Sequence, residues 1–418
     1  MVVCKGLQRQ LSLVCICVLL ISSILSFSTD VCAARQPRKR HFTSQQSHQR
    51  PKQYRRAKRY GGSDAYRRFK VKKDKISRLK KSSFWNKRPY QFSTPLIADG
   101  RLYVGVDAGV FYAFDVNRGK KLWKFKTKGS VQSKAAFSNG TVYFGDAKGV
   151  LYALDAFDGT VKWESQLDTE ILAAPLILGS RLYIPSMSGR LYALDTATGV
   201  EYWHTPPNER EFGFSVRRCA TPVAGFGFIY QGTSTGDVRA ISQADGHIAW
   251  VSKLGSRQSQ IYDVDSTPLL HENTLYVASA DGFLYSLDPT NGSVHWASDA
   301  GGVGDIIHRD GRLYSTGGGN LYALDPATGL IFWSQDFEKP AVSSPAAGNG
   351  FITVVSTIDK IYVVESETGD IAYERYIRKG SLGDPVVTDD EHIYVLSNSG
   401  RLFGFHVKRV KPKEKKTK

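Results

Sequence analysis

The sequence predicts an all-β protein, an eight-bladed β-propeller with four-stranded blades. A cassette of the form Gly-x-Leu-Tyr-Ala-Leu-Asp-x-x-Thr-Gly-x-x-x-Trp recurs along the chain. Its final aromatic residue stands at Trp123, Trp163, Trp203, Trp250, Trp296, Trp333 and Tyr373. An eighth copy, at 400–405, runs into a basic tail before any such residue. Eight units of roughly 40 residues need about 320 residues, and the segment 82–407 supplies them without a gap.

The strand missing from the last unit is expected at the other end of the repeats. Trp85 stands ten residues ahead of Pro95, much as Trp163 stands twelve residues ahead of Pro175. We therefore expect a strand around Trp85 to complete the eighth blade. Pairing the first and last strands of the array in one blade removes the open edge that a linear array leaves.

The first unit shows the pattern of strands and turns. Apolar residues alternate along 94–97, 101–105, 110–115 and 120–123, and Asp-Gly or Asn-Gly pairs mark hairpin turns. In five units an aspartate ends the third strand and a glycine stands about four residues later. We interpret these two residues as the cap and the positive-φ position of a turn. A metal loop is the alternative, but the acids occur singly in each unit. We interpret the tryptophans as spacers between blades, the alternative being a stacking platform for a ligand.

The N-terminus has the layout of a secretory signal peptide, predicted to span 1–33. Two basic residues precede an apolar run over 11–27, and small residues offer a cleavage site after Ala33. An uncleaved anchor is the alternative. The residues before Cys32 depart from a lipoprotein signal, so the sequence does not favour a lipid anchor there. Cys219 is the one cysteine within the repeats, and we expect no internal disulfide.

The positive charge lies outside the repeats. The segment 82–407 carries 28 basic and 35 acidic residues, whereas 35–81 carries 19 basic residues against two acidic ones. We expect the basic segment 34–81 and the basic tail 408–418 to be disordered. Such segments attract anionic lipid, phosphorylated polysaccharide or nucleic acid, and export argues against nucleic acid. A solvated tether without a partner is the alternative.

Two successive connections between units are enlarged. Trp203 and Pro222 are nineteen residues apart and Trp250 and Pro268 eighteen, against twelve from Trp163 to Pro175. Both connections lead from an outer strand to the next inner strand, so we expect them to emerge on the same face. Neighbouring long loops on a rigid scaffold favour a docking surface.

The residue types in these connections favour protein docking over catalysis. The first contains Phe214, Val216 and Arg217, and the second ends in Asp263 and Asp265. Aromatic residues, branched aliphatics and arginine dominate interface energetics. The two aspartates either pair with cations of a partner or hold the two connections together.

These cassettes resemble the quinoprotein-type propeller repeat. That family includes dehydrogenases that carry pyrroloquinoline quinone, and a non-enzymatic branch, the BamB-type proteins of the outer-membrane β-barrel assembly machinery. In the BamB branch the same two connections bind the POTRA region of BamA through a hydrophobic-x-hydrophobic-Arg stretch and an Asp-x-Asp pair. This resemblance implies that Phe214, Val216, Arg217, Asp263 and Asp265 contact a BamA-like partner, with Phe214 and Val216 where the family commonly has leucines.

The resemblance implies a non-enzymatic scaffold at the periplasmic face of an outer membrane, a monomer within a hetero-complex that can include further assembly proteins. We expect no cofactor, metal or catalytic residue, because the repeats hold no histidines at ligand spacing, nucleophile elbow or phosphate loop. An exported propeller that binds glycan or an anionic envelope surface is the first alternative. A quinone-dependent dehydrogenase is the second.

Overall fold

The structure is a computed structural model and describes residues 55–56, 69–73, 77–78, 92–208, 220–254, 263–338 and 341–410. Contacts divide the chain into two units, Met1–Lys52 and Gln53–Lys418, and every described residue belongs to the second. Across these residues the chain forms strands and turns, and the strands group into eight sheets. No helix long and apolar enough to cross a membrane occurs in the described part of the chain.

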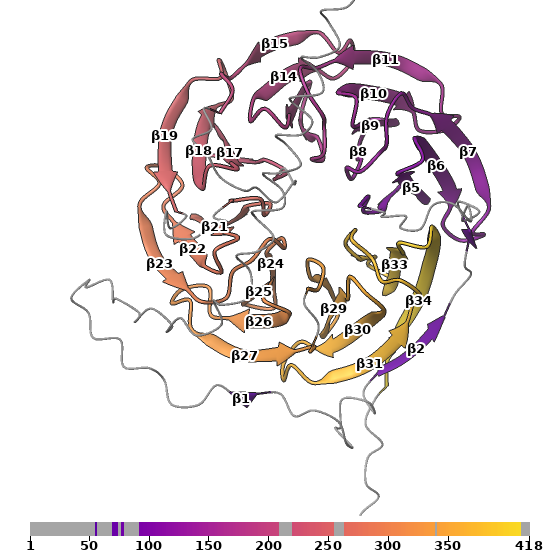
Figure 1. Cartoon of the computed structure of the whole chain (residues 1–418), viewed down its shortest axis with the longest axis vertical. Coiled ribbons are helices and arrows are strands. Elements are labelled where there is room, and N and C mark those ends of the chain that lie inside the picture. Colours follow the sequence, from indigo (N-terminus) through magenta and orange to yellow (C-terminus); the bar gives the residue numbers. More distant parts are fainter. Residues whose placement is uncertain are drawn as a thin grey trace, which may run out of the picture. The chain divides into compact units, whose positions relative to one another are not determined.

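Each sheet is one blade, and the blades follow one another around a central channel (Figure 1). Within blades 1 to 7 the first strand along the chain lies at the channel and the fourth at the rim. Blades 1 and 2 consist of β4 (Leu96–Ala98), β5 (Arg101–Val106), β6 (Val110–Asp115), β7 (Lys121–Lys126), β8 (Ala136–Ser138), β9 (Thr141–Gly145), β10 (Val150–Asp155) and β11 (Val161–Gln166). Blades 3 and 4 consist of β12 (Leu176–Leu178), β13 (Arg181–Pro185), β14 (Leu191–Asp195), β15 (Glu201–His204), β16 (Val223–Gly225), β17 (Phe228–Gly232), β18 (Asp237–Ser242) and β19 (Ile248–Lys253).

The second half of the ring repeats this arrangement. Blades 5 and 6 consist of β20 (Leu269–His271), β21 (Thr274–Ala278), β22 (Leu284–Leu287), β23 (Val294–Ser298), β24 (Ile307–Arg309), β25 (Arg312–Gly317), β26 (Asn320–Leu324) and β27 (Ile331–Asp336). Blade 7 consists of β28 (Ala346–Gly348), β29 (Phe351–Val355), β30 (Lys360–Glu365) and β31 (Ile371–Tyr376). Blade 8 contains the C-terminal strands of the chain, β32 (Val386–Val387), β33 (His392–Leu396) and β34 (Arg401–Arg409).

An N-terminal strand completes blade 8, as the repeats predict, but it lies upstream of the expected position. Strand β2 (Phe69–Lys73) pairs antiparallel with β34, and β3 (Ser77–Arg78) pairs with the same strand farther along (Figure 1). Trp85 lies outside the described residues. The aromatic side chain that β2 buries in the core is not a tryptophan but Phe69, which lies beside Phe351.

Part of the basic segment expected to be disordered therefore forms strands. Besides β2 and β3, the short strand β1 (Arg55–Arg56) pairs in parallel with β27 at the rim of blade 6. The ring thus begins before residue 82, its expected start. At the other end β34 continues to Arg409, two residues into the expected tail. The remaining basic residues of 34–81 and of 411–418 lie outside the described part of the chain.

The turn chemistry read from the sequence is confirmed. At Asp99-Gly100 both residues have positive φ, 48° and 67°, which is typical of the tight hairpin turn that Asp-Gly favours. At the end of β10, Asp155 Oδ1 accepts the backbone N–H of Phe157 at 2.8 Å, and this hydrogen bond holds the pKa of Asp155 below its usual value. Four residues later Gly159 takes φ 79°. The repeated aspartates therefore cap turns.

The hydrophobic core lies between the blades, and tryptophans fasten one blade to the next. Trp123 of blade 1 donates from Nε1 to the carbonyl oxygen of Ala156 in blade 2, at 3.1 Å. Its ring lies against Gly159, where an added Cβ would stand 2.7 Å from the indole. The hydroxyl of Tyr103 donates to the same carbonyl at 3.2 Å. The tryptophans thus act as spacers, as their placement predicts.

Candidate docking face

The connection from β15 to β16 covers residues 205–222, and that from β19 to β20 covers residues 254–268. The other connections from an outer strand to an innermost strand between β4 and β32 have eight or nine residues, as in 167–175. The two enlarged connections are therefore present where the sequence predicts them. They flank blade 4, so they are neighbours on the ring.

The described ends of both enlarged connections lie on the same face of the ring. The first begins against the turn between β13 and β14, where the Asn208 N–H donates to the Ser188 carbonyl at 2.9 Å. The second begins against the corresponding turn of blade 4, where the Leu254 N–H donates to the Gly236 carbonyl at 2.9 Å. It ends beside the turn of blade 5, where the Asp263 carbonyl accepts the Ala280 N–H at 2.8 Å. We call this side of blades 3 to 5 the docking face.

The predicted contact residues of the first connection, Phe214, Val216 and Arg217, lie outside the described residues, which resume at Ala220. The connection is anchored at its start by Thr205, which is 1% exposed. Its N–H donates to the Leu191 carbonyl, and its hydroxyl oxygen accepts the Leu191 N–H, both at 2.9 Å. This reciprocal pair holds the start of the connection on the docking face.

The two predicted aspartates of the second connection are buried. Asp263 is 1% exposed, and Asp265 is 7% exposed and lines the cavity at the centre of the ring. Between them the Val264 N–H donates to the Thr233 carbonyl in blade 4, at 3.0 Å. Burial favours the second of the two roles that the sequence left open, in which these carboxylates hold the connection in place. Their position directly before an innermost strand is the signal that the sequence offered for this role.

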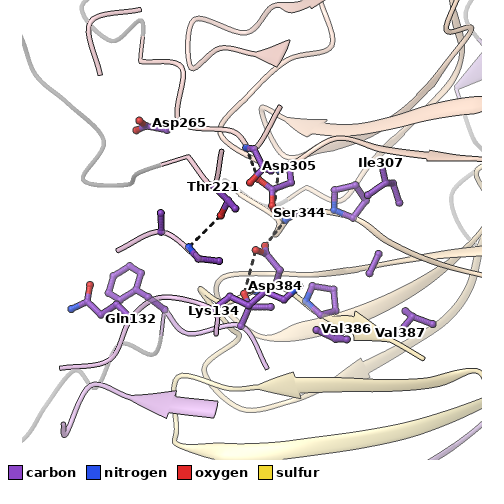
Figure 2. A pocket seen from close by; sticks show the side chains of 18 of the residues that line it. Gln132, Lys134, Thr221, Asp265, Asp305, Ile307, Ser344, Asp384, Val386 and Val387 are labelled. Carbon is purple, nitrogen blue, oxygen red and sulfur yellow. Dashed lines mark hydrogen bonds between the residues drawn. The ribbon is translucent and has the colours of Figure 1, made fainter. Parts of the chain in front are cut away.

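The central cavity has a volume of about 390 Å³ and is lined by equivalent positions of all eight blades (Figure 2). Each position lies two residues before the innermost strand of its blade. The residues there are Thr94, Lys134, Ala174, Thr221, Thr267, Asp305, Ser344 and Asp384. We call this set the channel belt.

Hydrogen bonds join the channel belt from blade to blade. The Thr267 N–H donates to Asp305 Oδ1 at 2.8 Å, and the Asp305 N–H donates to Ser344 Oγ at 2.9 Å. The Ser344 N–H donates to Asp384 Oδ1 at 2.8 Å, and the Asp384 N–H donates to Thr94 Oγ1 at 2.9 Å. Sequence reasoning missed Asp305 and Asp384. Their alignment with the Ser or Thr that precedes proline in other units could have identified them.

The cavity does not fit pyrroloquinoline quinone, the cofactor of dehydrogenases with this type of propeller. That quinone carries three carboxylates, which need cationic partners in a buried site. Asp265, Asp305 and Asp384 line the cavity, and Lys134 is the one cationic side chain among its described lining residues. Within the described ranges, no three His, Cys, Asp or Glu side chains are grouped so that they could hold a metal ion.

The repeat, the tryptophan contacts and the ring define an eight-bladed propeller of the quinoprotein-type repeat class. The family model described as "Outer membrane protein assembly factor BamB" matches residues 106–335 and 317–410. The chain belongs to this BamB family, as the resemblance in its sequence indicates.

Individual BamB proteins are also similar to this chain in sequence. BamB of Yersinia pestis is 27% identical over 199 residues, which cover 46% of this chain and 50% of that protein. BamB of Escherichia coli is 27% identical over 197 residues, covering 45% and 50%. The chain thus spans about half the length of the curated relatives it matches.

Solved structures share the fold. BamB from Moraxella catarrhalis superposes with a TM-score of 0.69 at 19% identity, covering 80% of this chain and 99% of that one. A quinohemoprotein alcohol dehydrogenase from Pseudomonas putida superposes with a TM-score of 0.67 at 14% identity, covering 83% and 78%. The fold is therefore common to assembly factors and enzymes, so function rests on the site.

Proposed function

We propose that this protein is a non-catalytic scaffold of the outer-membrane protein assembly machinery. Its docking face binds the periplasmic POTRA region of a BamA-like protein and so assists the insertion of β-barrel proteins. Further members of the assembly complex contact the same scaffold. The observation that carries the proposal is the pair of enlarged neighbouring connections in a chain that belongs to the BamB family.

The proposal divides the site residues into two groups. Phe214, Val216 and Arg217 contact the partner, because an aromatic residue, an aliphatic residue and an arginine form the kind of anchor that dominates protein interfaces. Asp263 and Asp265 position the second connection, because both are buried at its end. Buried carboxylates of this kind stabilise a loop through bonds to their surroundings.

Export to the periplasm is part of the proposal. The signal peptide over 1–33, with cleavage after Ala33 and no lipid anchor at Cys32, lies outside the described residues. The basic residues of 34–68 and 411–418 attract the anionic surface of the envelope, since screened attraction to phosphate needs no defined structure. A catalytic role is not favoured, because the channel carries carboxylates where the quinone needs cations.

Capture of a purified POTRA region by the full chain tests the proposal. We expect Arg217→Glu to abolish capture, because loss of a central interface anchor costs about 2 kcal/mol or more. Arg309→Glu is the matched control, because Arg309 ends β24 at the turn that leads to β25, away from the docking face. Undiminished capture by Arg217→Glu would refute the docking assignment.

A further inference from the structure

One position of the third strand carries a different kind of residue in blade 4. It directly precedes the partner of the outer-strand tryptophan, as Arg239 precedes Ala240, which pairs with Trp250. Six other blades carry a tyrosine at this position, and blade 8 carries a phenylalanine. These residues are Tyr112, Tyr152, Tyr192, Tyr285, Tyr322, Tyr362 and Phe403.

This position meets the connection that leads into its own blade. In blade 2 the Tyr152 hydroxyl oxygen accepts the N–H of Lys128, which lies in the connection from β7 to β8, at 2.9 Å. In blade 5 the Tyr285 hydroxyl donates to the carbonyl oxygen of Leu254, the first residue of the second enlarged connection, at 2.8 Å. The same position in blade 4 places Arg239 toward the first enlarged connection.

Neighbouring side chains link this position to the docking face. Gln231 lies directly opposite Arg239 in the register of β17 and β18, so the two side chains share one face of blade 4. Gln231 Nε2 donates to the Gly189 carbonyl, in the docking-face turn of blade 3, at 3.4 Å. Asn208 lies over the same glycine, because an added Cβ on Gly189 would stand 2.2 Å from Asn208 Cγ. We call Asn208, Gln231 and Arg239 the polar cluster.

Each member of the polar cluster has a buried polar atom with no hydrogen-bond partner among the described residues. These atoms are Asn208 Oδ1, Gln231 Oε1 and Arg239 Nε. Most buried polar atoms of native proteins are paired, and a buried charge that lacks a partner is the most costly case. Burial lowers the pKa of the Arg239 guanidinium below its usual value, and the nearby Asp237 carboxylate opposes this shift. Arginine still stays charged at neutral pH, so the cluster needs an anionic partner group.

We propose that Arg239 binds a carboxylate of the POTRA region and is thus a partner-binding residue outside the two enlarged connections. This inference rests on the proposed function, which brings that partner to the docking face. Arg239 is partly exposed, so a partner can reach it. A carboxylate fits a guanidinium best, because it can accept two parallel N–H bonds. The tyrosines of the other blades carry no charge, so Arg239 makes blade 4 selective for an acidic segment of the partner.

Titration calorimetry of the full chain with a purified POTRA region tests the inference. Arg239→Tyr introduces the residue type that six other blades carry. We expect it to weaken binding about 30-fold or more, which corresponds to about 2 kcal/mol. Binding by the variant should also depend less on salt, because one ion pair is lost. The melting temperature of the chain without partner should not fall, because the variant removes a buried donor that lacks an acceptor.

A control and two comparisons make the result decisive. Arg309→Gln removes a cation on the other side of the ring and should bind like the wild type. Unchanged affinity in Arg239→Tyr beside abolished capture in Arg217→Glu would overturn this inference alone. Unchanged binding in both variants, or no binding by the wild type, would refute the proposed function as well. A melting temperature lowered by Arg239→Tyr would assign the guanidinium to a contact within the chain and would also overturn the inference.

Discussion

Trp163 and Gly199 meet across the junction of blades 2 and 3 with no room for a methyl group. A Cβ on Gly199 would stand 2.5 Å from the indole, closer than real Cβ contacts come. Trp163 Nε1 also donates to the Thr196 carbonyl at 3.0 Å, so the ring cannot move aside without losing that bond. Gly199 is therefore required for two reasons. It adopts a positive φ, and it leaves the space that the indole of Trp163 occupies.

Gly199→Ala should destabilise the ring more than Gly179→Ala. Both glycines have positive φ, 72° and 59°, so both variants carry a left-handed strain of roughly 1–2 kcal/mol. Nothing lies within 4 Å of an added Cβ at Gly179. The clash with Trp163 adds about 1–3 kcal/mol at Gly199. Urea unfolding measures the difference, and equal free energies of unfolding would contradict the contact.

Phe69→Ala should destabilise the whole ring, because it weakens the strand that completes blade 8. Phe69 is 5% exposed, and its ring meets Phe351 of blade 7 edge-on, with centroids 5.9 Å apart. Truncation of a buried phenylalanine costs about 3–5 kcal/mol. Thermal melts of the full chain provide the measurement. Lys70→Ala is the control, because the exposed Lys70 lies on the same strand, and a similar loss from both variants would deny Phe69 this role.

The sequence predicted the number of blades, their turns and the presence of a completing strand. It could do so because each unit repeats the same strand, turn and outer-strand aromatic residues. The expected position of that strand was wrong because its aromatic residue is not a tryptophan. Phe69, within an otherwise basic strand, lies in the core beside Phe351 of blade 7. The available signal was the alternation of apolar residues with lysines over Phe69–Lys73, which is typical of a strand with one buried face.

The docking face was predictable in part. Chain length between Trp203 and Pro222 reveals an enlarged connection regardless of how that connection folds. Chain length does not reveal whether a side chain of the connection points into the ring or into solvent. Asp263 and Asp265 resemble exposed acids in the sequence, yet the hydrogen bond from the Val264 N–H to blade 4 draws the segment into the wall of the ring. The residue types alone do not reveal such a tertiary contact, and the position of the pair just before an innermost strand was the one available signal.

Asp263→Ala and Arg217→Glu should weaken partner capture for different reasons. Removal of the buried Asp263 carboxylate leaves its surroundings without a partner, at a cost of about 1–3 kcal/mol in the free energy of unfolding. Arg217→Glu should abolish capture and leave the melting temperature unchanged. Capture assays paired with thermal melts separate the two effects. Loss of capture by Asp263→Ala without any loss of stability would instead assign that carboxylate to the interface.

Alkaline pH should unfold the ring through its buried tyrosines. Burial raises the pKa of Tyr103 and of Tyr230 from 10.0 to about 12, and both hydroxyls donate to backbone carbonyls of the next blade. The unfolded chain therefore releases these protons first. The free energy of unfolding should stay constant below pH 10 and decrease between pH 10 and 12, by up to about 1.4 kcal/mol per pH unit for each tyrosine. Urea midpoints measured across this window provide the test. Tyr103→Phe combined with Tyr230→Phe should flatten the decline, and an equally steep decline in that variant would assign the effect to other groups.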